Sequence, residues 1–433
     1  MNRGSYLFIV GLFAVSCTGD AGGGGVNIDE TPEVTTTTIV TTTSVPPTTT
    51  TTVPTYQITG KVTRPDGTPV PRVDVTMGEQ IAVTDSEGIF SFETTDPQTM
   101  MVSRVGWSKA EIPWDEAMTF FEVTVTQDTV RGLRVSPDAA ANDAVFRQLL
   151  TLADQTAVNT LVFDTKQEGG KVLYDTAVAD AHAIGAVSPL YDPATRVAQA
   201  HEAGLYAITR LVAFEDSHRS GAFPDERIAS GWLDPTSATA REYNLALARE
   251  ACQIGFDEVQ FDYIRYPSGS TATTTGQLDM TQEQRVGNIA SFLAEARSVL
   301  HPMGCAVSAA IFGIVASAEN DQGLGQRPDE LSAHLDAVSP MVYPSHYSPG
   351  WLGFEDPNAH PYDVTADALN DALPRMADGS QLRPWLQAFW WSNEQIRRSI
   401  QAAEDLGLGW ILWNVRSNFD LEALPTDEEV ATR

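Results

Sequence analysis

The sequence contains few basic residues and few cysteines. Lys and Arg number 27 against 57 Asp and Glu, so the 433-residue chain carries a net charge of −30. A polyanion of this size is repelled by nucleic acid, which argues against a nucleic-acid partner. Three Cys are too few for a disulfide scaffold or a Cys-rich zinc module. The 42% of apolar residues, with 9 Trp, suffice for a large core, and the length favours two folded units plus tails.

The N-terminus has the features of an export signal. Arg3 precedes an apolar run from Tyr6 to Val15, which is too short to span a bilayer as a helix. The run ends in small residues before Cys17, an arrangement that resembles a bacterial lipoprotein processing site. We therefore expect 1–17 to be a signal sequence and Cys17 to carry a lipid anchor on the outer face of the cell membrane. Ordinary secretion without a lipid is the alternative.

Residues 18–55 are rich in Thr and Pro, with pure Thr runs at 35–38 and 48–52. Such a segment has too few bulky apolar side chains to offset the entropy of ordering. Pro and β-branched Thr keep the backbone extended, so the composition predicts a disordered stalk.

Residues 56–128 show the pattern of a small β domain. Alternating apolar residues are interrupted by turns at 65–67 and 85–88, which predicts an all-β sandwich. The segments 60–62, 66–70 and 84–90 resemble the carboxypeptidase regulatory-like sandwich. That resemblance implies a spacer or adhesion unit, and the segment has no cluster of titratable residues that would indicate catalysis.

From Val130 onward, strands alternate with helices such as 238–253 and 283–300. Eight strand–helix units in this length predict an α/β fold, a (β/α)₈ TIM barrel over 130–420 with a tail at 421–433. A doubly wound sheet would show a glycine-rich turn after its first strand, and none follows Val135. The expected strands are 130–135, 160–166, 205–214, 258–267, 305–313, 337–344, 382–390 and 409–415.

Acidic and aromatic residues lie at the expected carboxyl ends of these strands, where barrels hold their active sites. Side chains two apart share a face, so Gln260 and Asp262 should point the same way, as should Asp164 and Lys166. A carboxylate inside a barrel strand is costly unless it is paired or functional, which makes Asp262 the candidate catalytic carboxylate. A structural ion pair of Asp262 with Arg265 or Lys166 is the alternative.

Carboxylates beside Trp rings suit carbohydrate chemistry, because sugars stack on rings and glycosidic cleavage needs two carboxyl groups. We expect Glu319, after strand five, to be the general acid, with Asp321 and Glu215 as alternatives. The residues expected to bind substrate are Asp164, Lys166, Arg210, Glu215, Gln260, Arg265, Tyr343, His346, Gln387, Trp413 and Asn414.

The region from about 130 to 419 resembles a family of glycoside hydrolases first catalogued as a domain of unknown function. The motifs that carry the likeness are 159–166, 255–267, 339–347, 358–362, 383–387 and 410–414. The resemblance implies a barrel related to α-amylase-like hydrolases, whose strand-four nucleophile corresponds to Asp262. The family often has an acid at the position of Ala310, so a pocket carboxyl is missing there.

The sequence thus predicts an exported, surface-tethered, monomeric glycoside hydrolase that acts on a polysaccharide or cell-surface glycan and needs no cofactor. One alternative is a non-catalytic glycan-binding protein. The other is a metal-dependent hydrolase, although His346 and His360 form no recognised zinc spacing and we expect no metal. Cys252 and Cys305 both fall near the lower rim of the barrel, and the sequence leaves open whether they are bonded.

Overall fold

The computed structural model describes residues 54–104, 106–118 and 120–431. The expected signal sequence, the lipidation site Cys17 and almost all of the expected stalk lie outside the described residues. Within the described part of the chain, no helix is both long and apolar enough to cross a membrane.

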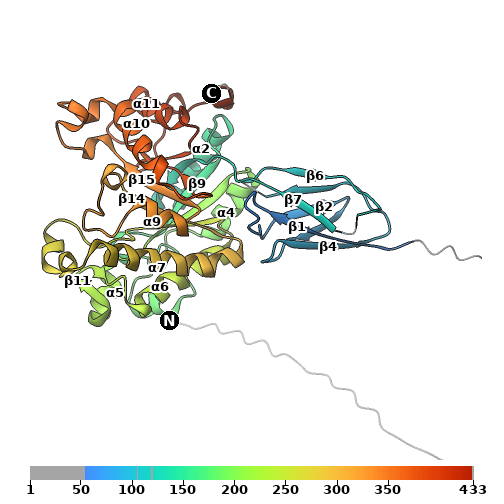
Figure 1. The fold of residues 1–433 in the computed structure, drawn as a ribbon, viewed down its shortest axis with the longest axis horizontal. Helices are drawn as coiled ribbons and strands as arrows, with labels where there is room; N and C mark the ends of the chain where they lie inside the picture. Colours follow the sequence, from blue (N-terminus) through green and yellow to red (C-terminus); the bar gives the residue numbers. More distant parts are fainter. Residues whose placement is uncertain (1–53, 105, 119, 432–433) are drawn as a thin grey trace, which may run out of the picture. The chain divides into compact units, whose positions relative to one another are not determined.

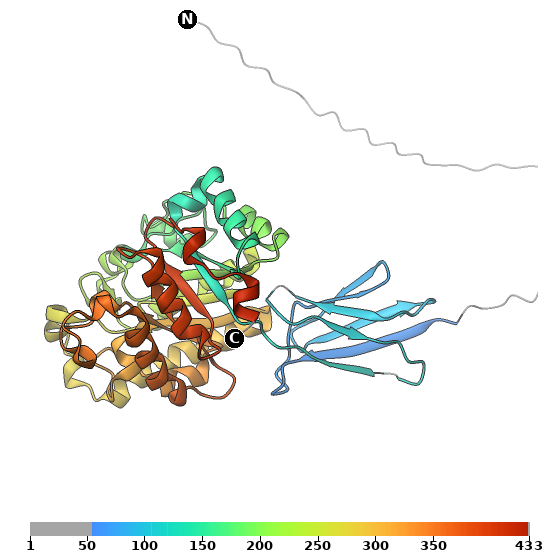
Figure 2. The same ribbon diagram turned by 90° about the horizontal axis from the view of Figure 1, so that it is seen from above.

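The N-terminal region consists of two sheets (Figure 2). Strands β4, β1 and β7 form one sheet, and β3, β2, β5 and β6 form the other. A shared apolar core, with Ile58, Val75 and Phe121 among its members, lies between the sheets because alternate residues of each strand face inward. The likeness to a carboxypeptidase regulatory-like domain stays a prediction. The strands are β1 Tyr56–Thr63, β2 Asp74–Met77, β3 Gln80–Val83, β4 Ile89–Thr94, β5 Met100–Ser103, β6 Ala110–Ile112 and β7 Phe120–Thr124.

The rest of the chain is a closed parallel barrel surrounded by helices (Figure 1). Its strands pair in the order β8, β9, β10, β13, β14, β15, β17 and β18, and β18 pairs with β8 to close the ring. The predicted (β/α)₈ barrel is therefore confirmed. The strands are β8 Arg131–Val135, β9 Thr160–Lys166, β10 Tyr206–Val212, β13 Glu258–Asp262, β14 Ala306–Phe312, β15 Ala337–Val342, β17 Trp385–Gln387 and β18 Trp410–Trp413. The short strands β11 Arg227–Ala229 and β12 Trp232–Leu233 pair with each other outside the ring, whereas β16 Gln381–Leu382 pairs with the start of β15 and precedes β17 in the barrel wall.

Two long helices occur where the sequence predicts them, as α6 Ala238–Ile254 and α7 Gln282–Leu300. Ser237 caps α6, and Thr281 and Gln284 form a capping box at the start of α7, which explains where each helix begins. The other helices are α1 Pro137–Ala141, α2 Asp143–Asp154, α3 Ala179–Ala183, α4 Pro193–Glu202, α5 Ser217–Ala222, α8 Ile314–Ser317, α9 Pro328–Leu331, α10 Pro361–Ala372, α11 Asn393–Glu404 and α12 Asp427–Ala431.

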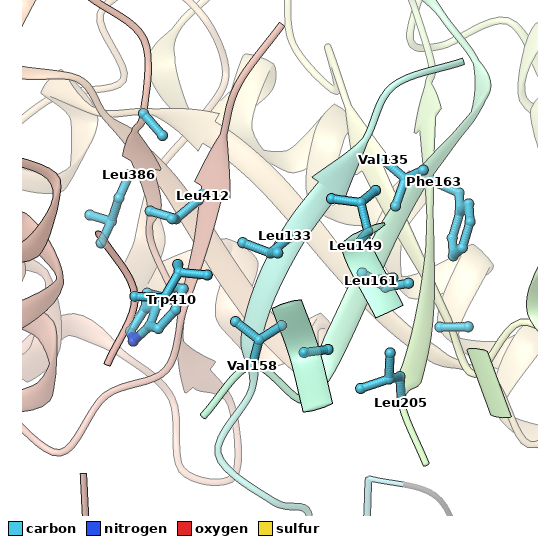
Figure 3. Packing of buried hydrophobic residues seen from close by; sticks show 14 of the residues in the cluster. Leu133, Val135, Leu149, Val158, Leu161, Phe163, Leu205, Leu386, Trp410 and Leu412 are labelled. Atoms are coloured by element: carbon cyan, nitrogen blue, oxygen red, sulfur yellow. The ribbon is translucent and has the colours of Figure 1, made fainter. Parts of the chain in front are cut away.

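The outer face of the barrel packs against the helices. Leu133, Leu161 and Leu412 lie across adjacent strands, and Leu149 on α2 packs in the same cluster (Figure 3). The inside of the barrel holds a second apolar cluster, with Ile208, Trp385 and Ile411 among its members, together with buried polar side chains. Gln260 accepts a hydrogen bond from Trp385 Nε1 at 2.7 Å and donates to Ser339 at 3.1 Å. The barrel interior is therefore a packed core, and space for a ligand remains only at its mouth.

A disulfide joins Cys252, near the end of α6, to Cys305, just before β14. The sequence left open whether these two cysteines are bonded, and the structure shows that they are. It links the elements that flank β13, the strand that carries Asp262.

Candidate active site

A cavity of about 640 Å³ opens at the carboxyl end of the barrel. Its wall is formed by residues on or just after seven of the barrel strands, and the parallel topology brings these strand ends together. The lining residues are Glu168, Arg210, Asp262, Tyr263, Arg265, Phe312, Gly313, Ile314, Met341, Tyr343, His346, Tyr347, Ser348, Trp351, Phe389 and Trp413.

Asp262 is the last residue of β13 and is held in place by two contacts. Its Oδ2 lies 2.8 Å from Nε and 2.6 Å from Nη2 of Arg210. Its Oδ1 accepts the backbone N–H of Tyr263 at 2.7 Å. Tyr263 has a φ of 49°, a left-handed conformation that is uncommon outside glycine. This turn ends the strand at the carboxylate and occurs, as such strained residues often do, at a candidate functional site.

Arg210, on β10, is surrounded by three carboxylates. Besides Asp262, its Nη2 lies 2.5 Å from Glu168 Oε1 and its Nη1 lies 3.3 Å from Asp164 Oδ1. These charges raise the pKa of Arg210 well above its usual value, although burial acts in the opposite direction. Because Glu168 and Asp262 contact the same nitrogen, their nearest oxygens can lie at most about 5 Å apart, which is closer than the carboxyl pair of an inverting glycosidase.

Glu168 is a residue that the sequence reasoning missed. It lies in the loop after β9, and its side chain is 44% exposed. Arg210 lowers the pKa of the Glu168 carboxyl, outweighing the opposite effect of burial. The sequence feature that could have identified Glu168 is its position two residues beyond a barrel strand and directly before Gly169 and Gly170. Both glycines have positive φ, 78° and 88°, and let the loop turn back over the mouth.

Aromatic side chains form much of the wall. Arg134 and Arg210 stack on the ring of Trp413, with guanidinium carbons 4.2 and 4.9 Å from its centre. Tyr343 packs edge-on against Phe389 and His346 at centroid distances of 5.5 and 5.4 Å. Burial lowers the pKa of His346, so a neutral imidazole faces the cavity at pH 7. The site thus combines ring surfaces with neutral hydrogen-bonding groups, among them His346 and Tyr343.

Lys166 is not in this site, contrary to the expectation that it shares a face with Asp164. Arg210 pairs with Asp164 in the strand register, but the next residue, Leu211, pairs with Lys166, so Thr165 is an extra residue. This irregularity turns Lys166 to the other side of the strand, where it lies 2.8 Å from Asp216. Asp164 remains inside and also contacts Arg134 at 2.5 Å. Lys166 is therefore part of a buried structural ion pair.

Three expected substrate-binding residues support the site without lining the cavity. Gln260 is fully buried in the barrel interior. Gln387 accepts the backbone N–H of Ser345 at 3.2 Å, and Asn414 donates to the carbonyl of Ala388 at 2.6 Å. These amides hold the loops after β15 and β17 in position.

The structure does not bring Glu319 to Asp262. Glu319 is exposed and lines a separate hollow that also contains Arg327 and Arg375. Asp321, the alternative in the same loop, is bound by Arg285 at 2.7 and 2.8 Å. The pairing of catalytic carboxyls expected from the sequence is therefore absent from the geometry.

Glu215 lies closer to the cavity than these two residues. Its Oε2 accepts the backbone N–H of Gly169 at 2.6 Å, next to Glu168. Burial raises the pKa of Glu215. Glu215 is not one of the cavity-lining residues.

Two features of the wall limit its chemistry. Ala310 is buried in the barrel interior against residues such as Trp385 and Tyr343, so β14 adds no carboxylate at this position. Among the described residues, no group of three or more His, Cys, Asp or Glu side chains is arranged to hold a metal ion.

The comparisons with known proteins agree with this geometry at the level of the family. Residues 132–419 match the family described as "putative glycosyl hydrolase domain". No curated protein matches the chain.

Three solved structures illustrate the structural likenesses. A hypothetical protein from Ruminiclostridium thermocellum is 30% identical, with 41% of this chain and 96% of that chain covered and a TM-score of 0.35. The PgaB (BpsB) glycoside hydrolase domain from Bordetella bronchiseptica is 13% identical, with 67% and 95% covered and a TM-score of 0.49. The catalytic domain of β-amylase from Paenibacillus polymyxa is 14% identical, with 70% and 96% covered and a TM-score of 0.46. These TM-scores are too low to support conclusions about a substrate.

Proposed function

The chain belongs to the family of the putative glycosyl hydrolase domain, and from that premise we propose that it hydrolyses O-glycosidic bonds of a polysaccharide by a two-carboxylate mechanism. The observation that carries the proposal is the pair Glu168 and Asp262, joined by one Arg210 nitrogen in a cavity walled by aromatic rings. A pair this close leaves too little room for the water of an inverting mechanism, which favours the retaining route through a covalent intermediate.

In this mechanism Asp262 is the nucleophile. Its carboxylate attacks the anomeric carbon, and the bond from that carbon to the glycosidic oxygen breaks while Glu168 gives its proton to the departing oxygen. Glu168 then takes a proton from water, which attacks the anomeric carbon and releases Asp262. Arg210 orients Asp262 through one carboxylate oxygen, and the N–H of Tyr263 holds the other oxygen.

The assignment of Glu168 as the acid rests on position. A general acid must lie within reach of the leaving oxygen, and Glu168 is the second carboxyl group among the cavity-lining residues. Glu215 has the raised pKa that an acid needs at neutral pH, but it lies behind the Glu168 loop, bonded to Gly169. The comparison of Gln variants at the two positions, described in the Discussion, decides between them.

Aromatic surface at and beyond the cavity supports a polymeric substrate. Trp390 is 84% exposed and packs edge-on against Phe389, which lines the cavity, at a centroid distance of 5.0 Å. Sugar rings present C–H faces that pack on such indoles. The export signal and the Thr/Pro-rich segment read from the sequence support action on glycans outside the cell, with Cys17 as the proposed lipid attachment.

The experiment is a screen of purified protein against cell-wall and exopolysaccharide substrates, with new reducing ends measured over time. We expect release from at least one polymer and, by NMR of the first product formed, retention of the anomeric configuration. Inversion would remove Asp262 from the nucleophile role. Activity that disappears on exhaustive chelation and returns with added metal would favour the metal-dependent alternative.

A second candidate function is glycan binding without cleavage. The specific observation that favours it is Ala310, which leaves β14 without a carboxylate at the mouth. Binding of oligosaccharides with no release from any polymer in the screen would establish this candidate in place of the hydrolase.

A further inference from the structure

Two guanidinium groups line the cavity, and they differ in how they are paired. Arg210 contacts three carboxylates. Arg265 is 5% exposed and donates from Nη1 to the carbonyl of Tyr266 at 3.0 Å. Among the residues described by the structure, no carboxylate lies within ion-pair distance of Arg265, and its Nε and Nη2 have no hydrogen-bond partner.

Aromatic rings contact the Arg265 guanidinium, while the carboxylates of Asp262 and Glu215 act on its charge from beyond ion-pair distance. Its guanidinium carbon lies 4.7 Å from the ring centre of Trp232, 4.9 Å from that of Tyr263 and 4.4 Å from that of Phe312. These ring faces offset part of the cost of burying the charge. Burial lowers the pKa of Arg265, but an arginine stays protonated in proteins. The cavity therefore contains a largely buried cation whose Nε and Nη2 make no hydrogen bond to the described residues, so these donors are free to bind a ligand in the cavity.

The unused donors have the geometry that carboxylates prefer. Nε and Nη2 lie on one edge of the guanidinium plane, so together they bind both oxygens of one carboxylate. The same chain uses this edge elsewhere. Arg131 holds Glu404 through Nε and Nη2 at 2.6 and 2.9 Å, and Arg285 holds Asp321 through the same atoms at 2.7 and 2.8 Å. At Arg265 the edge is present and the carboxylate partner is missing.

We propose that Arg265 binds a carboxylate of the substrate, so that the site acts on an acidic glycan. The inference rests on the proposed function and names the substrate class of the same site. Arg265 follows Asp262 by three residues, and both line one cavity, which places the acidic sugar at or next to the bond that is cleaved. The carboxylate belongs to a uronic acid or to the lactyl ether of a muramic acid. Although the chain as a whole carries −30, the charged residues that line the cavity are two carboxylates and two arginines, so the cavity itself has no excess of negative charge.

The test compares each acidic polymer with the same polymer after its carboxyl groups have been reduced to alcohols. We expect the wild type to favour the acidic form. Arg265→Gln should lower kcat/KM on the acidic form by about 10- to 100-fold and change it less than about 3-fold on the reduced form. Arg265→Lys, which keeps the charge but loses the bidentate edge, should fall between the two. Arg147→Gln, on the exposed face of α2, is the matched charge control and should change neither rate.

Uronate polymers and glycan strands of peptidoglycan form separate arms of the experiment and distinguish the two sources of the carboxylate. An equal loss on the acidic and reduced forms would show that Arg265 only supports the aromatic wall, and would overturn the proposal. A wild type that prefers the reduced form would overturn it as well.

Binding separates this inference from the proposed hydrolysis. Calorimetric titration of Asp262→Asn with acidic oligosaccharides and their reduced forms does not require turnover. Tighter binding of the acidic form that Arg265→Gln abolishes supports the carboxylate site even if no polymer is cleaved. Equal binding of both forms, or no binding of either, rejects the site whatever the outcome of the hydrolysis assay.

Discussion

Strand β13 places two buried carboxylates on the same inward face, at opposite ends of the barrel interior. Glu258, at the lower end, is fully buried and pairs with Arg383, which is also fully buried. Asp262, at the upper end, pairs with Arg210 and borders the cavity. Both are arginine–carboxylate pairs in the same barrel, so ion pairing does not identify the active site. Access does, because only the upper pair borders a cavity that a ligand can enter.

The two pairs should therefore respond in opposite ways to substitution. Asp262→Asn is expected to lower kcat by at least about 10³-fold, because the nucleophile is lost while the shape is kept. The unfolding free energy should change by less than about 1 kcal/mol, since Asp164 and Glu168 still pair with Arg210. Reducing-end release and urea unfolding measure the two quantities.

Asp154→Asn, at an exposed position at the end of α2, is the control for Asp262→Asn and should change neither quantity. Full activity of Asp262→Asn would exclude Asp262 as the nucleophile. A large loss of stability in that variant would instead make the upper pair a structural one like the lower pair.

The lower pair should show the reverse behaviour. Arg383→Met leaves the Glu258 carboxylate buried without its cation, and we expect the free energy of unfolding to fall by about 3–5 kcal/mol. The folded fraction should keep its kcat. Urea unfolding, with activity assayed below the transition, gives both values. The double variant Glu258→Gln/Arg383→Met should recover most of the stability, and a double variant as unstable as the single would contradict the ion-pair explanation.

The barrel itself was predictable because its strands are short buried runs and its two longest helices begin at clear caps, Ser237 and Thr281. β9 occurs at the predicted 160–166. β13 was predicted to reach residue 267 but ends at Asp262, because the left-handed backbone of Tyr263 leaves the sheet direction there. Nothing in the apolar pattern marks that turn.

The composition of the site was harder to predict. Asp262 could be found because a carboxylate within an apolar strand is unusual. The pairing of β9 with β10 shifts by one residue between Arg210 and Leu211, and this shift turns Lys166 away from the site. A prediction from side-chain alternation assumes a regular register and therefore misses it. Glu319 and Glu168 both lie in loops, and only the folded chain shows which loop turns over the mouth.

The next expected effect concerns the proton donor at the mouth. Glu168→Gln should lower kcat/KM by about 10²-fold on natural glycans, because the leaving oxygen then departs without a proton. Nitrophenyl glycosides need little protonation and should lose far less. Arg210 lowers the pKa of Glu168, so this carboxyl is ionised at neutral pH and gains its proton only as the pH falls. Wild-type activity should therefore rise from neutral toward acidic pH.

Glu215→Gln is the comparison for Glu168→Gln and should retain most activity on both kinds of substrate. The opposite result would be a Glu215→Gln variant that loses activity on natural glycans but not on nitrophenyl glycosides, together with a neutral pH optimum of the wild type. It would make Glu215, whose pKa is raised by burial, the general acid.

The smallest effect on activity should come from a substitution at the exposed rim of the mouth, outside the cavity itself. Trp390 has a φ of 60° and is 84% exposed, so the chain holds a large indole in a strained conformation without burying it. If the ring carries sugar units beyond the cavity, Trp390→Ala should raise KM about 5- to 10-fold for long oligosaccharides and leave the shortest cleaved substrate unaffected. The removal of a ring that is largely exposed should cost little stability. Steady-state kinetics over a series of chain lengths measures the effect, with Leu190→Ala as an exposed apolar control away from the cavity. A KM that rises equally at every chain length would show that Trp390 acts indirectly, by holding Phe389 in the cavity wall. The glycan-binding surface would then be limited to the cavity itself.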